Sequence, residues 1–134
     1  MTIVERIDTF LGAAAFGVVG ASSKPYKYGN KVLRCYQQNQ RRVVPVNPVA
    51  REIEGLACVP SVADLPEEVG SISIITPPQV TEEVVEQAIA RGIRNVWMQP
   101  GAESVQAVAA CEQAGVNVIA DGSCLLVVMG YREH

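Results

Sequence analysis

The chain has 134 residues, of which 49% are hydrophobic and 19% charged, and its formal net charge is −3. These values predict one domain spanning residues 1–134 and exclude a disordered chain. The sequence has no basic stripe, which argues against a nucleic-acid partner. Its longest apolar runs, such as LLVVM at 125–129, are too short to cross a membrane, and the N-terminal stretch lacks the basic start of a secretory signal. We therefore expect a cytoplasmic protein.

The cysteines and the histidine give no sign of a metal site or of nucleophilic catalysis. Cys35, Cys58, Cys111 and Cys124 are too far apart in sequence to form a zinc or dithiol motif. His134, the single histidine, is the last residue and offers no placed base. The sequence thus predicts no metal ligands and no catalytic residues.

Short β-branched runs alternate with longer amphipathic stretches. A leading helix is expected over 2–11, and the first strand is FGVV. Thr81 is expected to cap a helix that Gly92 ends, and Pro45 indicates an edge strand. The segment 50–66 reads as irregular, with a turn at Glu54-Gly55, and LLVVMG is a final apolar element. The pattern predicts strands at 16–19, 43–46, 71–76, 95–98 and 116–120, and further helices at 30–40, 81–91 and 102–114.

Alternation of strands and helices predicts an α/β fold, a Rossmann-like doubly wound parallel sheet of about five strands with helices on both faces. The simplest order of the strands, numbered along the chain, is 3-2-1-4-5. In such a sheet, ligands bind beyond the carboxyl ends of the strands, at the switch between the first and fourth strands.

The end of the first strand has the composition of an anion site. Gly20 permits a tight turn, and the small residues Ala21 and Ser22 leave the backbone amides accessible. The next helix starts near Gly29 and directs its N-terminal amides at the loop, while Lys24 and Lys27 add mobile cations. The alternative is that the glycine only makes the turn and that the lysines are solvated.

Comparison with dinucleotide-binding sites reduces the number of candidate ligands. The G-x-G-x-x-G pattern is absent, and Asn47-Pro48 stands where an NAD site has an acidic residue. Arg41, Arg42 and Arg51 would suit a phosphorylated ribose. These features argue against NAD and leave NADP and coenzyme A as candidate ligands.

Several linked motifs carry a family resemblance. VVGASSKPYKYGNKV, VVPVNP, the following GL-x-C-x-PSVADLP, VWMQPGAES and DGSC occur in this order over roughly Ile7 to Cys124. Together they resemble the small stand-alone CoA-binding proteins, whose Rossmann-like fold is similar to the N-terminal domains of succinyl-CoA synthetase α subunits and of ADP-forming acyl-CoA synthetases. Because the synthetases rely on a phosphorylated histidine in a second domain, the resemblance implies binding of CoA and leaves catalysis open. The sequence offers no placed histidine, no metal cluster and no paired carboxylates at the crevice, so we expect a binding protein without catalysis of its own.

The resemblance also implies a set of binding residues. Gly20, Ala21, Ser22 and Lys24 would hold the phosphates, and Val46, Asn47 and Pro48 would line the adenosine side. Thr76, Pro77 and Pro78 would border the ligand. At these positions the chain resembles the synthetases more than the stand-alone members. Gln99, Pro100 and Gly101 would lie near the pantetheine.

Two single residues complete this hypothesis. Tyr28 in the glycine loop is as consistent with ligand contact as with packing. Cys124 is placed where the thiol arm could reach, so thiol chemistry with CoA is one interpretation, and packing at a helix start is the one we favour.

The sequence therefore predicts a protein that binds coenzyme A or an acyl-CoA. Two alternatives stay open: an NADP-dependent oxidoreductase, although no Tyr-x-x-x-Lys pair occurs, and a non-binding partner module of an acyl-CoA synthetase. The oligomeric state is also open, since LLVVMG could pack internally or against a second copy.

Overall fold

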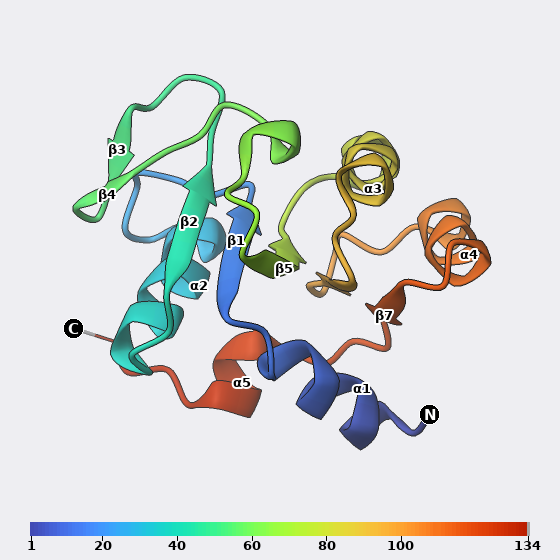
Figure 1. Cartoon of the computed structure of the whole chain (residues 1–134). Helices are drawn as coiled ribbons and strands as arrows, with labels where there is room; N and C mark the ends of the chain where they lie inside the picture. Colours follow the sequence, from blue (N-terminus) through green and yellow to red (C-terminus); the bar gives the residue numbers. More distant parts are fainter. Residues whose placement is uncertain (134) are drawn as a thin grey trace.

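A computed structural model describes residues 1–133 of the chain and leaves His134 outside the described residues. A parallel five-stranded sheet forms its central layer (Figure 1). The strands are β1 (Ala15–Val19), β2 (Val43–Val46), β5 (Val69–Ile74), β6 (Asn95–Met98) and β7 (Asn117–Ile119). The prediction of an α/β, Rossmann-like parallel sheet is confirmed.

Helices cover both faces of the sheet. One face packs against α1 (Ile3–Leu11), α2 (Tyr28–Gln38) and the short α5 (Leu125–Met129), with Phe10, Phe16 and Trp97 in its core. The other packs against α3 (Pro78–Arg91), α4 (Val105–Gln113) and a 3-10 turn, η1 (Val62–Asp64). Side chains alternate between the two faces along each strand, so β1 directs Phe16 and Val18 to the first core and Val19 to the second.

The strand order differs from the prediction. The sheet runs β2-β1-β5-β6-β7, which is 2-1-3-4-5 for the five strands in chain order. The predicted order 3-2-1-4-5 is therefore wrong, because the third strand pairs directly with the first (Gly17 with Ile72) instead of continuing outward beyond β2. The switch point consequently lies between β1 and β5.

The connection from β2 to β5 explains this order. It holds a small hairpin, β3 (Glu52–Ile53) and β4 (Leu56–Ala57), and then η1, which packs against α3 on the face opposite α2. The chain thus crosses the sheet to reach the far side of β1. The predicted turn at Glu54-Gly55 is present, with positive φ values of 50° and 77°. Pro45 lies on an edge strand, as predicted.

The start of α3 also corrects the sequence interpretation. The helix begins at Pro78, and Pro77 occupies the N-cap position. Thr81 is fully buried inside the first turn, where its hydroxyl lies 2.8 Å from that of Thr76, so the prediction that it caps the helix is wrong. Gly92 ends the helix in the left-handed conformation, as predicted. None of the helices within residues 1–133 is long and apolar enough to cross a membrane.

Candidate functional site

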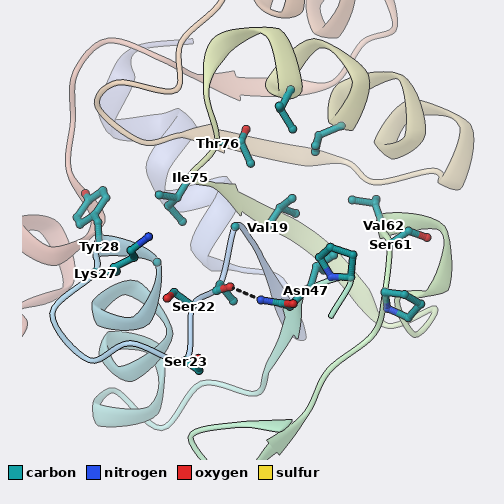
Figure 2. Close-up of a pocket in the computed structure, with 18 of the residues that line it drawn as sticks. Val19, Ser22, Ser23, Lys27, Tyr28, Asn47, Ser61, Val62, Ile75 and Thr76 are labelled. Atoms are coloured by element: carbon teal, nitrogen blue, oxygen red, sulfur yellow. Dashed lines mark hydrogen bonds between the residues drawn. The ribbon is translucent and has the colours of Figure 1, made fainter. Parts of the chain in front are cut away.

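A pocket of about 730 Å³ opens at the carboxyl ends of β1, β2 and β5 (Figure 2). Its volume is in the range of small-molecule sites. Nine of the predicted site residues line it: Gly20, Ala21, Ser22, Lys24, Tyr28, Val46, Asn47, Pro48 and Thr76. The structure thus brings the first, second and third strand ends together around one cavity.

Two glycines set the shape of the loop between β1 and α2. Gly20 has a φ of +93°, and a Cβ atom there would lie 2.0 Å from the carbonyl oxygen of Ile75. A Cβ on Gly29 would lie 2.1 Å from the carbonyl oxygen of Gly20. Only glycine fits at either position, so the start of α2 can pack directly onto the end of β1. Dinucleotide fingerprints use their last glycine for the same close approach of helix and strand. In this chain Gly29 has that role, at a longer spacing from Gly20 than in the fingerprint.

Side chains from outside the loop bind its carbonyl groups. The residues involved come from α2 and from the segment after β2. Ala21 O accepts from Asn47 Nδ2 at 2.9 Å, Ser22 O from Asn30 Nδ2 at 2.8 Å, and Pro25 O from Arg34 Nη2 at 2.7 Å.

Three backbone amides at the start of the loop, in contrast, are left available. Within the described part of the chain, no hydrogen-bond partner is found for the amides of Ala21, Ser22 and Ser23. The first turn of α2 has no side-chain cap. Loop amides and helix-start amides of this kind are suited to bind an anion, which the positive end of the helix dipole would also attract.

Two lysines add positive charge at the pocket wall. Lys24 and Lys27 both line the pocket and are exposed. Neither takes part in an ion pair within residues 1–133, whereas Lys31 on α2 lies 3.6 Å from Glu133. Both amino groups are therefore free to move toward an anionic ligand.

Asn47 has a structural use that the sequence did not indicate. Besides its bond to Ala21, its Oδ1 atom accepts from the amides of Val49 and Ala50, both at 2.8 Å. It thus connects the loop after β2 to the loop after β1, as the dashed line in Figure 2 marks for Ala21. Its side chain shapes this side of the pocket by holding both loops.

The wall opposite the glycine loop is largely apolar. Val62 of η1 and Val80 and Val84 of α3 line it, with Ser61 and Gln87 as polar groups at its edge. Figure 2 shows Ser61 and Val62 on the side of the pocket away from Lys27 and Tyr28. Reasoning from strand ends missed these residues, because they lie on the crossover connection and inside a helix. The one available signal was the helical spacing of positions 80, 84 and 87, which places them on one face.

Six predicted residues lie outside the pocket lining: Pro77, Pro78, Gln99, Pro100, Gly101 and Cys124. Gln99 and Cys124 are nevertheless connected to the pocket through Tyr28. The Tyr28 hydroxyl lies 2.9 Å from Gln99 Oε1 and 2.7 Å from Cys124 Sγ. Pro100 and Gly101 are exposed beyond the end of β6.

The donors and acceptors available fix the direction of this chain of hydrogen bonds. A carboxamide oxygen only accepts, so Tyr28 donates its single proton to Gln99, and Cys124 is left to donate its thiol proton to Tyr28. Burial raises the pKa of Tyr28, and the contact with Cys124 raises it further. Cys124 is the N-cap residue of α5, in line with the packing role that the sequence favoured for it. Gln99 is fully buried, and its Nε2 atom has no partner within the described residues.

The basic residues considered for a phosphorylated ribose do not lie in the pocket wall. Arg41 donates to Leu11 O and lies over the ring of Phe16, and Arg42 pairs with Glu68 at 3.4 Å. Both precede β2 and so lie at the amino end of the sheet, opposite the pocket. This placement removes Arg41 and Arg42 as binding residues for a phosphorylated ribose, an argument that applied equally to NADP and to coenzyme A.

The pocket has hydrogen-bond donors and positive charge on one side and apolar side chains on the other. Free amides and lysines gather on one side, and valines line the other. Within residues 1–133 no group of three or more His, Cys, Asp or Glu side chains is arranged to hold a metal ion.

Comparisons with known proteins identify the family of the chain. Residues 14–129 match the family described as the CoA binding domain. The chain is 35% identical over 95 residues to the ADP-forming acetate–CoA ligase II of Archaeoglobus fulgidus, in an alignment that covers 69% of this chain and only 14% of the ligase.

Solved structures extend the likeness over most of the fold. A conserved hypothetical protein from Pyrococcus furiosus superposes with a TM-score of 0.81 at 41% identity, covering 85% of this chain and 97% of that one. A hypothetical protein from Pyrococcus horikoshii has a TM-score of 0.87 at 31% identity, covering 95% and 89%. Since the family match spans most of the sequence, the chain belongs to the CoA binding domain family.

Proposed function

We propose that this chain binds coenzyme A or an acyl-CoA in the pocket at the carboxyl ends of β1, β2 and β5, and that it acts as a binding protein without catalysis of its own. The amides of Ser22 and Ser23 and the start of α2 would hold the phosphates, assisted by Lys24 and Lys27. The valine wall of η1 and α3 would receive an apolar part of the ligand. Bound coenzyme A would supply a thiol and its thioesters, and this chain's part would be to hold and orient it.

One observation carries the proposal: at the start of the loop after β1, side chains bind the carbonyl oxygens of Ala21 and Ser22, while the amides of Ala21, Ser22 and Ser23 have no hydrogen-bond partner within residues 1–133. Asn47 binds the carbonyl of Ala21, and Asn30 binds that of Ser22. A loop that served only as a connection would have no need for this asymmetry, because water would satisfy both kinds of group equally. A loop prepared for phosphate oxygens needs donors and no competing acceptors.

A titration series tests the function. Isothermal titration calorimetry of the purified chain with CoA, dephospho-CoA and NADP should show saturable binding of CoA and weaker or no binding of NADP. Tight binding of NADP with no response to CoA would replace this proposal with the oxidoreductase alternative.

The likeness to ADP-forming acetate–CoA ligases supports a second candidate, a partner module of an acyl-CoA synthetase that has no ligand affinity of its own. This function predicts that none of the three nucleotides binds to the isolated chain. The same titration therefore separates it from the CoA-binding proposal.

A further inference from the structure

Asn30 is a fully buried polar residue directly behind the glycine loop. It lies in the first turn of α2 and makes three side-chain hydrogen bonds. Its Nδ2 atom donates to Ser22 O at 2.8 Å and to Glu54 Oε2 at 3.1 Å, and its Oδ1 atom accepts from Arg34 Nε at 2.7 Å. Because a guanidinium can only donate, Oδ1 must face Arg34, and the amide group must face the loop carbonyl.

The position of the Ser22 carbonyl determines where the next amide points. A trans peptide is planar, and its C=O and N–H groups point in opposite directions. Asn30 does not line the pocket, so its bond draws the Ser22 oxygen away from the cavity. The N–H of Ser23 is therefore turned to the other side, and Ser23 lines the pocket.

Arg34 extends the same network to a second point of the loop. While Nε donates to Asn30, Nη2 donates to Pro25 O at 2.7 Å, and Glu133 lies 3.8 Å from the guanidinium. The carboxamide of Asn30 is thus held from one side by Arg34 and from the other by Glu54. Because three partners hold it, the carboxamide of Asn30 keeps one orientation. A carboxamide that was hydrogen-bonded only to water would be free to rotate.

We propose that Asn30 is a positioning residue for ligand binding: it holds the Ser22–Ser23 peptide so that the Ser23 amide donates to a phosphate of the ligand. This inference rests on the proposed function and deepens it, because it assigns the orientation of the phosphate donors to a residue that does not touch the ligand.

Gln37 offers a matched control. It lies on α2, and its Nε2 atom donates to Glu54 O at 3.1 Å, so it contacts the same hairpin as Asn30 without touching the glycine loop. Asn30→Ala and Gln37→Ala therefore both weaken the contact between α2 and the hairpin. Only Asn30→Ala releases the Ser22 carbonyl.

The test combines calorimetry with two-dimensional ¹H–¹⁵N NMR of the Ser23 amide. With the original sequence, added CoA should move the Ser23 amide proton downfield as it bonds to phosphate, and Gln37→Ala should behave in the same way with affinity within about twofold. Asn30→Ala should weaken CoA binding about tenfold or more and should greatly reduce the shift of Ser23 at saturation. The shift reports the amide itself, so a general loss of stability would not reproduce this result.

If the alanine variant does not fold, Asn30→Asp provides a second variant, whose side chain has nearly the same size as asparagine. It lacks the N–H group that donates to Ser22 O and should give the same loss of the Ser23 shift. An unchanged Ser23 shift and affinity in a folded Asn30 variant would overturn the positioning role while leaving CoA binding intact. Absence of CoA binding by the original sequence would instead overturn the proposed function.

Discussion

The hydroxyl of Tyr28 donates to Oε1 of Gln99 across 2.9 Å, although 71 positions separate the two residues in the sequence. The same Gln99 atom accepts the amide of Leu125 at 2.9 Å. Through these two bonds, one buried carboxamide connects the pocket wall to the start of α5. The relationship explains why Tyr28, the first residue of α2, is partly buried although it lines a cavity.

Replacement of Tyr28 by phenylalanine should lower the free energy of unfolding by about 1–2 kcal/mol, because the hydrogen bonds to Gln99 and Cys124 are lost while the ring is kept. Urea denaturation followed by circular dichroism would measure the change. Tyr26→Phe is the control, since Tyr26 is 70% exposed, and its effect should be close to zero. Equal stabilities of the two variants would contradict the role of the Tyr28 hydroxyl.

Replacement of Gly29 by alanine should destabilise the fold by about 3 kcal/mol or more and abolish CoA binding. The added Cβ would lie 2.1 Å from the Gly20 carbonyl oxygen, so α2 would have to move away from β1. This outcome is the reverse of the usual gain for glycine to alanine in a helix. Thermal unfolding would measure it.

Gly115→Ala is the matched control for that change. Gly115 has a positive φ of 74°, but a Cβ added there would meet no other atom within 4 Å, so only the backbone cost of about 1 kcal/mol is expected. A Gly29 variant as stable as the Gly115 variant would show that the helix–strand contact is not tight.

Replacement of Lys24 by alanine should weaken CoA binding about 3- to 5-fold and make the affinity less dependent on salt, and Lys27→Ala should act similarly. Both lysines are exposed, so each would form a solvent-exposed ion pair with a phosphate of the ligand. An exposed ion pair contributes up to about 1 kcal/mol to binding and is strongly screened by salt. Calorimetry at two salt concentrations would measure both effects. Lys31→Ala, which removes a lysine that pairs with Glu133, should leave the affinity unchanged. Unchanged binding by the Lys24 variant would remove this residue from the site.

Raising the pH above about 9 should destabilise the folded protein. Burial raises the pKa of Cys35 and of Cys111 from 9.0 to about 11. Between these values the unfolded chain has lost the thiol protons that the folded chain still holds, so the free energy of unfolding falls as the pH rises. Tyr28 and Tyr36, whose pKa burial also raises, should continue the loss at higher pH.

Urea denaturation at pH 8, 9, 10 and 11 would follow this decline. Cys111→Ala should make the slope shallower between pH 9 and 11, after correction for its lower stability at pH 8. A slope that is the same with and without Cys111 would contradict the assignment.

The sequence by itself determined the layers of the fold and the position of the glycine loop. Strand and helix periods follow from which face of each element is buried, and that information is local, so the strand at 95–98 and the end of α3 at Gly92 could be predicted directly. Gly20 could be identified because a sharp turn after a buried strand has a local residue requirement.

Only the tertiary structure decided the strand order and the support of the loop. The order depends on which face the connection from β2 to β5 crosses, and the short elements there have no periodic signal. Asn30 looks like an ordinary polar residue in sequence, and Asn47 was predicted only to line the ligand. Their part in holding the carbonyls of Ser22 and Ala21 arises only when segments distant along the chain pack together, because a hydrogen bond across the fold leaves no local pattern.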